Sequence, residues 1–215
     1  IDNDGDGLID EDFDLDGDGF TTCGVEPSCG ILMDLFHEED TWSDPYDYTS
    51  DHAWGFAADL LEDNGWSWSA NETTAISDTL LSAHDVLVIA EPLTSFSSDE
   101  IAAIVDYVDG GGGLLLATDF NDTYMDQVAS QFGVDFQGYS NLLGWVAIDD
   151  WDDTHAVSDG IDSVFWAYGS SFDVSNTDVE VLGTYAGDDV YAVLEYGAGR
   201  VVFSAEDAEA WYAAA

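Results

Sequence analysis

Basic residues are almost missing from this sequence of 215 residues, which has no lysine and a single arginine, Arg200. Forty-seven aspartates and glutamates give a formal net charge of −46 at pH 7. Because so few cations cannot neutralise phosphate, nucleic acid and anionic membranes are excluded as partners. Repulsion among the carboxylates destabilises the folded state unless cations screen or bind them.

Long apolar runs are also missing, so we expect no membrane insertion, and no signal peptide is recognisable. The sequence begins inside a repeat and lacks an initiator methionine, which we interpret as a processed or excerpted piece of a longer secreted protein. Hydrophobic residues still make up 46% of the chain, with 8 Trp, 10 Tyr and 11 Phe. This composition predicts a packed core instead of global disorder.

The acidic excess has two compatible interpretations, a high-salt habitat or a calcium-rich extracellular setting. Asp outnumbers Glu by 35 to 12, which favours turns and loops dense in oxygen ligands. The two cysteines, Cys23 and Cys29, lie close together and predict a local disulfide, since their spacing is not that of a zinc site. Asn71 and Asn121 begin N-glycosylation sequons, which give weak support for secretion.

Residues 1–24 form two units of twelve residues, IDNDGDGLIDED and FDLDGDGFTTCG, with D-x-D-G-D-G at the same offset. Calcium takes six to eight oxygen ligands, and alternate carboxylates converge on one ion where a glycine permits a sharp bend. The pattern therefore predicts two calcium sites. The predicted ligands are Asp2, Asp4, Asp6, Leu8, Asp10, Asp12, Asp14, Asp16, Asp18, Phe20 and Glu26, where Leu8 and Phe20 contribute backbone carbonyls.

These loops depart from the EF-hand pattern, because position 12 holds Phe13 and Val25 instead of a bidentate Glu. They resemble thrombospondin type 3 repeats and the acidic D-x-D-G-D-G repeats of bacterial surface proteins. That resemblance implies that consecutive loops share ligands and that calcium replaces a hydrophobic core. An acidic flexible linker is the alternative interpretation.

From residue 31 onward, apolar strands alternate with amphipathic helices, which predicts an α/β fold with a mostly parallel sheet and helices on both faces. Antiparallel pairs are expected at one edge among the later strands. We predict a calcium-repeat module at 1–29 and an α/β domain at 30–215. Strands are predicted at 31–37, 66–70, 85–90, 113–119, 145–148, 163–167, 179–184, 190–195 and 200–204, and helices at 51–64, 76–83, 97–109 and 122–132.

The segments ILMDLFHEE, HDVLVIAEP, SSDEIAAIVDYVDGGGGLLLATDF, THAVSDGI and GAGRVVFSAED resemble class I glutamine amidotransferase-like domains, and above all their non-catalytic relatives. The resemblance covers about residues 31–207 and implies a flavodoxin-like three-layer sandwich. Catalytic members place a cysteine on the turn after a central strand. This sequence has Asp119 there, and no G-x-S-x-G motif occurs. We therefore predict that the chain is not an enzyme.

Several polar residues at strand ends remain open to a functional interpretation. His37, with Glu38, Glu39 and Asp40, either forms a metal or general-base site or lies on a surface loop, which we favour. His52 is expected to be structural or exposed, His84 to pack beside the strand that it precedes, and His155 to make structural hydrogen bonds. Three acids are expected near one sheet edge, where they either bind a cation or serve as caps and solvated residues: Glu91, Asp119 and Glu206.

The sequence as a whole predicts an extracellular or cell-surface calcium-binding protein with a structural or adhesive role. Its expected partners are calcium ions and other copies of itself or other surface proteins, in a larger assembly or fibre. The alternative is a secreted hydrolase with a rearranged site at His37, Glu91 and Asp119.

Overall fold

The computed structural model describes residues 30–37, 61–62, 65–118, 122–138, 146–148, 150–158, 161, 164–166 and 169–206. The predicted calcium loops, the cysteine pair, Asn121, Asp119 and His52 lie outside the described residues. None of the helices in the described part is long and apolar enough to cross a membrane.

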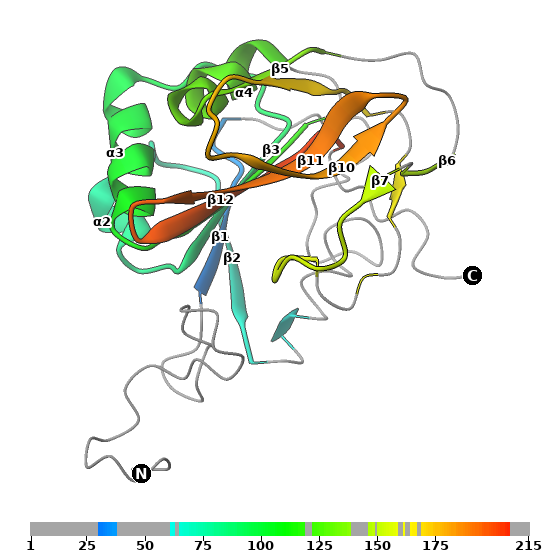
Figure 1. The fold of residues 1–215 in the computed structure, drawn as a ribbon. Helices are drawn as coiled ribbons and strands as arrows, with labels where there is room; N and C mark the ends of the chain where they lie inside the picture. The colour runs from blue at the N-terminus through cyan, green and yellow to red at the C-terminus, as the bar shows by residue number, and fades with distance from the viewer. Residues whose placement is uncertain are drawn as a thin grey trace, which may run out of the picture.

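A mixed ten-stranded sheet forms the centre of the domain, and its main path runs β2-β1-β3-β4-β12-β11-β10-β7 (Figure 1). The strands from β2 to β12 are parallel, whereas β11, β10 and β7 continue the sheet in antiparallel fashion. The parallel strands are β1 (Gly30–Asp34), β2 (Ser67–Asn71), β3 (Val86–Ala90), β4 (Gly113–Ala117) and β12 (Gly199–Ser204); the antiparallel ones are β11 (Asp188–Tyr196), β10 (Glu180–Tyr185) and β7 (Asp150–Trp151).

Short strands complete the antiparallel part. β9 (Phe172–Val174) pairs with both β11 and β5 (Val134–Phe136). A separate two-stranded sheet joins β6 (Val146–Ala147) to β8 (Phe165–Trp166). The predicted combination of parallel strands with antiparallel pairs at one edge is thereby confirmed, in a sheet that is mixed.

The described helices are α2 (Asp78–Leu81), α3 (Ser98–Asp109) and α4 (Asp122–Ala129), followed by the 3-10 turn η1 (Ser130–Phe132). Their apolar side chains share one core cluster with the sheet; Ile104, Val108 and Val128 are fully buried there. A second cluster on the opposite face includes Ile31 and Met33 and is packed by Leu61, which belongs to the predicted helix 51–64 and is helical where described.

Local signals in the sequence account for the ends of these helices. A capping box opens α3, because the Ser97 hydroxyl accepts from the Glu100 N–H and the Glu100 carboxylate accepts from the Ser97 N–H. Gly133 ends η1 at a φ of 83°, a left-handed conformation that glycine adopts without steric cost. The first strand is shorter than predicted, because the chain turns after Asp34, whose carboxylate accepts from the Phe36 N–H.

Like charges meet in the antiparallel part of the sheet. Asp135 on β5 lies directly opposite Asp173 on β9. Burial raises the pKa of Asp189 on β11, and the nearby carboxylates of Asp173 and Asp188 raise it further. A raised folded-state pKa means that ionised Asp189 costs stability above that pKa. The cost disappears as the pH falls through the folded pKa toward the unfolded value.

We therefore expect Asp173→Asn to stabilise the protein at neutral pH and low salt, by about 0.5–1 kcal/mol in the free energy of unfolding. The substitution removes a charge that faces Asp135 and repels Asp189. Urea denaturation at low and high NaCl, and at acid pH, measures the effect, which should fade in both high salt and acid. Asp178→Asn, at an exposed turn, is the matched control and should change little; an equal gain from that control would contradict the prediction.

Candidate functional site at the carboxyl edge of the sheet

Open α/β sheets bind ligands beyond the carboxyl ends of their strands, where neighbouring connections leave in opposite directions. In this sheet β1 has β2 on one side and β3 on the other, so that crevice lies beyond Asp34 at the end of β1. The turn that follows β1 carries His37 into this region. The backbone carbonyl of His37 accepts from the Leu93 and Thr94 N–H groups, which tie the turn to the loop after β3.

His37 is buried at the centre of a charged cluster, with 2% of its surface exposed. Its Nδ1 lies 2.6 Å from Asp34 Oδ2, and its Nε2 lies 3.3 Å from Glu100 Oε1. The imidazole stacks on the Phe96 ring with a centroid separation of 3.9 Å and an interplanar angle of 28°. Asn71, at the end of β2, donates through Nδ2 to the other oxygen of Asp34. The β1 turn, the loop before α3 and α3 itself therefore meet at this imidazole, and β2 is linked to it through Asp34.

The Glu100 carboxylate opens α3 through Ser97 and has two further partners, Ile76 and His37. Its Oε1 accepts from the Ile76 N–H at 3.1 Å and faces His37, while its Oε2 accepts from the Ser97 N–H at 2.8 Å. Burial alone would raise the pKa of Glu100, but the hydrogen bonds from Ser97 and Ile76 and the charge of His37 hold this pKa below its usual value. Glu100 therefore contributes stability above its unfolded-state pKa, and that contribution is lost as the pH falls through the folded-state pKa.

The predicted surface position of His37 is wrong, because the side chain fills the crevice. In this conformation each ring nitrogen faces a carboxylate oxygen, so neither is directed at a substrate. Its predicted companions Glu38, Glu39 and Asp40 lie outside the described residues. The actual partners of His37 are Asp34 and Glu100. The sequence could have indicated Asp34, because it lies three residues before His37 in DLFH. The contact with Glu100 could not be predicted, because it depends on the tertiary fold.

Two further acids predicted at this edge are found there. Glu91 follows β3 and Glu206 follows β12, the two strands that flank β4. Both are buried, at 2% and 7% exposure. Glu91 adopts a φ of 42°, uncommon outside glycine, and its N–H donates to Ala117. Glu206 Oε2 accepts from the Tyr191 hydroxyl at 3.2 Å.

The remaining predicted residues have structural surroundings. His155 accepts from the Val157 N–H, as expected for a turn residue, and His84 contacts Ser69 and the Leu80 carbonyl. Asn71 is buried, and its Nδ2 donates to both Asp34 and the Thr74 carbonyl. A glycan on that nitrogen would displace both hydrogen bonds, so the folded structure disfavours Asn71 as an acceptor.

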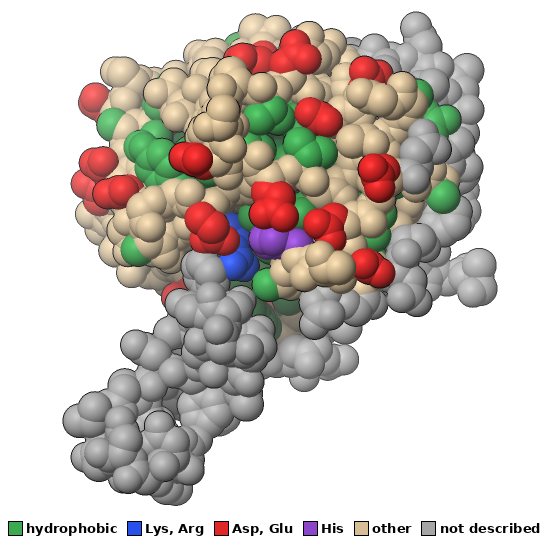
Figure 2. All heavy atoms as spheres, viewed as in Figure 1, with side chains coloured by type: hydrophobic (Ala, Val, Ile, Leu, Met, Phe, Trp, Pro, Cys, Tyr) green, Lys and Arg blue, Asp and Glu red, His purple; other side chains and the backbone are tan. Residues whose placement is uncertain are grey.

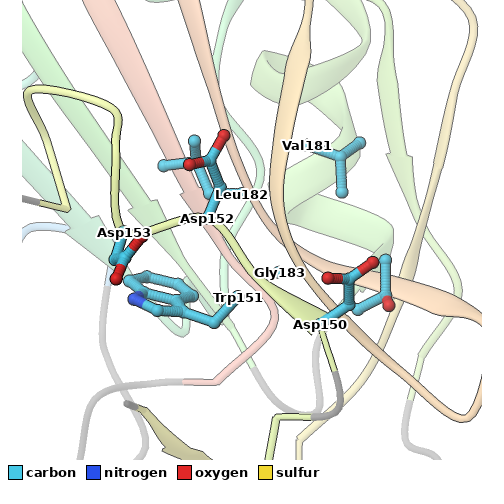
Figure 3. Close-up of a pocket in the computed structure, with 8 residues that line it drawn as sticks. Asp150, Trp151, Asp152, Asp153, Val181, Leu182 and Gly183 are labelled. Carbon is cyan, nitrogen blue, oxygen red and sulfur yellow. The ribbon is translucent and has the colours of Figure 1, made fainter. Parts of the chain in front are cut away.

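A recess of about 370 Å³ opens elsewhere, where β7 meets β10. Figure 3 shows two of the residues that line the recess on opposite sides of the Trp151 label, with Asp153 beside the indole and Asp150 away from it. The neighbouring Asp152 carboxylate accepts from Thr154, and these hydrogen bonds lower the pKa of Asp152. Across the described ranges, no three His, Cys, Asp or Glu side chains are grouped so that they could hold a metal ion.

The sequence matches no protein-family model and no curated protein. Solved structures share its fold. The mmIFT52 N-terminal domain has a TM-score of 0.66 at 13% identity, over 84% of this chain and 87% of that one. A cytoplasmic protein from Salmonella typhimurium LT2 has 0.64 at 14%, over 85% and 90%. A ThuA-like protein from Bacteroides uniformis has 0.61 at 15%, over 86% and 85%. These similarities confirm the α/β, flavodoxin-like fold.

Proposed function

We propose that this chain is an extracellular calcium-binding structural module, in which calcium orders the N-terminal repeats and the α/β domain acts as a spacer or contact module. The observation that carries the proposal is the duplicated D-x-D-G-D-G spacing at residues 2–7 and 14–19. Carboxylates at alternate positions before a glycine match what calcium requires of a flexible oxygen site. The calcium-dependent contacts are proposed to join copies of this chain or other surface proteins.

The carboxyl edge supports a contact role for the α/β domain. His37 occupies the crevice where a ligand of such a sheet would enter, and its ring is packed on Phe96. The surface supports cation dependence: Figure 2 shows Asp and Glu side chains spread over the visible face, whereas Lys and Arg colour appears in one patch. Such a surface repels its own copies unless divalent ions bridge or screen it.

A hydrolase that uses His37, Glu91 and Asp119 is the second candidate, and one observation favours it. Glu91 is a buried carboxylate held at positive φ beside a central strand, and strained backbone conformations cluster at functional sites. Glu91→Gln would abolish hydrolysis if this candidate holds, and would leave calcium binding unchanged if the first does.

Calcium titration of the whole chain, followed by isothermal calorimetry, tests the first proposal. We expect two ions bound per chain, one per loop. At a calcium concentration 100 times Kd, each bound ion should raise the free energy of unfolding of the calcium-bound segment by about 2.7 kcal/mol. EDTA should reverse the shift in melting temperature. Magnesium should substitute poorly, because it requires stricter octahedral geometry.

A matched pair of variants separates loop binding from general charge screening. Asp4→Asn with Asp16→Asn removes one ligand from each loop, and we expect calcium affinity to fall at least tenfold. Asp106→Asn with Asp178→Asn makes the same change in net charge in α3 and an exposed turn, and should leave the affinity unchanged. Equal losses in both double variants, or a melting temperature that EDTA does not move, would contradict the proposal.

A further inference from the structure

His84 is fixed in place at the end of α2, on the far side of the strands from the carboxyl edge. Its backbone N–H donates to the Leu81 carbonyl at 3.0 Å, and its carbonyl accepts from the Tyr107 hydroxyl at 3.2 Å. Its Nδ1 lies 3.0 Å from the Leu80 carbonyl. Because these contacts come from α2 and α3, the imidazole is preorganised by packed elements instead of by a loose loop.

The contacts of the ring decide its tautomer. A carbonyl oxygen only accepts, so Nδ1 carries the hydrogen and Nε2 of the neutral ring presents a lone pair. That lone pair faces the hydroxyl of Ser69 on β2, with Nε2 and Oγ 3.0 Å apart. Both residues are half-buried, so the pair borders solvent. A serine whose hydroxyl meets a base, itself oriented by a third group, is the arrangement that activates oxygen nucleophiles.

Ser69 has a second acceptor, which allows the ring to take up a proton. Its Oγ also lies 3.2 Å from the Ile31 carbonyl. With a neutral ring, the hydroxyl hydrogen points to Nε2. With a protonated ring, Nε2 donates to Oγ and the hydroxyl hydrogen turns to the Ile31 carbonyl. Every polar atom keeps a partner in both states, so proton transfer to His84 leaves no unsatisfied buried group.

We propose that Ser69 and His84 form a nucleophile–base pair that accepts acyl or phosphonyl groups from activated esters. Oγ attacks the electrophilic carbon or phosphorus while its proton moves to Nε2, and the bond to the leaving group breaks with its electron pair. Aryl esters are the substrate class, because a phenolate departs without taking a proton. Nε2 then releases this proton to the solvent. Water attacks the acyl-serine and gives one proton to Nε2, which passes it to the departing Oγ, while the second proton of the water leaves with the carboxylic acid product. The pair is independent of the calcium loops and of the carboxyl edge.

The test is labelling of the whole chain with a fluorophosphonate probe, read by intact-protein mass spectrometry and peptide mapping. We expect one adduct, on Ser69, and none on Ser69→Ala. His84→Asn keeps a side-chain N–H near the Leu80 carbonyl but removes the base, and should slow labelling roughly 100-fold. Ser67→Ala, two residues earlier on the same strand, is the matched control and should label like the wild type.

Wild-type labelling should also rise with pH as the imidazole loses its proton, and the rate of His84→Asn should lack that rise. An unlabelled wild type, an adduct that persists in Ser69→Ala, or a wild-type rate that does not follow histidine deprotonation would overturn the proposal. The pH profile is measured on the wild type alone, so it decides the question even if His84→Asn folds poorly. If the hydrogen bond between Ser69 and His84 had only a structural role, the probe would not label Ser69.

Discussion

Raising NaCl from about 0.01 M to about 1 M is expected to raise the melting temperature of this protein by roughly 10 °C or more. The formal charge of −46 leaves the folded chain under strong self-repulsion, and one arginine cannot relieve it. Within the described ranges, Arg200 is held by a surface carboxylate, with Nε 2.6 Å from Glu195 Oε1. Exposed pairs of this kind contribute about 0–1 kcal/mol, so screening by dissolved cations is the larger effect.

Differential scanning calorimetry across a NaCl series measures the shift, with KCl as a second series. Sucrose at equal osmolality is the control, because it favours compact states without screening charge. A melting temperature that stays constant across the salt series would show that the carboxylates are too far apart or too hydrated to repel. A steeper response to calcium than to NaCl at equal ionic strength would further support specific calcium sites.

His37→Ala is expected to lower the free energy of unfolding by about 3–5 kcal/mol, because it leaves two buried carboxylates without their shared partner. Asp34 and Glu100 are 1% and 6% exposed, so water cannot replace the imidazole without opening the crevice. The variant also loses the stacking on Phe96. For a chain of this length the loss corresponds to a fall in melting temperature of roughly 10 °C.

Chemical denaturation of His37→Ala, alone and combined with Asp34→Asn, measures how much of this loss comes from the unpaired charge of Asp34. Asp34→Asn added to His37→Ala should recover part of the stability, because it removes one of the uncompensated charges. His155→Ala is the control; it removes a histidine whose hydrogen bond lies in a solvent-facing turn, and should cost about 1 kcal/mol. If His37→Ala cost no more than His155→Ala, the charged cluster would not be a stabilising feature.

Strongly patterned segments were predictable from the sequence. Three local patterns predicted elements close to their observed positions. They are the capping box at Ser97 and Glu100, the apolar spacing of α3, and the buried apolar runs of β3 and β4. β5, β7 and β9 were missed, because strands of two or three residues carry too little periodicity and depend on neighbours that are distant in sequence.

The location of the candidate site could be predicted from the sequence, but the contacts between its side chains could not. Glu91 and Glu206 could be assigned to one edge because each follows a buried strand. The burial of His37 could not, since its partner Glu100 lies 63 residues away and reads locally as a helix cap. A side chain with two simultaneous roles is visible only after the fold has brought both sets of neighbours together.

Because Glu100 both caps α3 and contacts His37, few substitutions at this position can keep both contacts. Shortening it to aspartate would withdraw its oxygens from the Ile76 N–H as well as from the imidazole, and glutamine would place an uncharged group against His37. Homologous sequences should therefore exchange Asp34, His37 and Glu100 as a linked set, with apolar residues replacing all three where the charge is lost. A lineage that retained the acids without the histidine would have to admit solvent beyond the carboxyl end of β1.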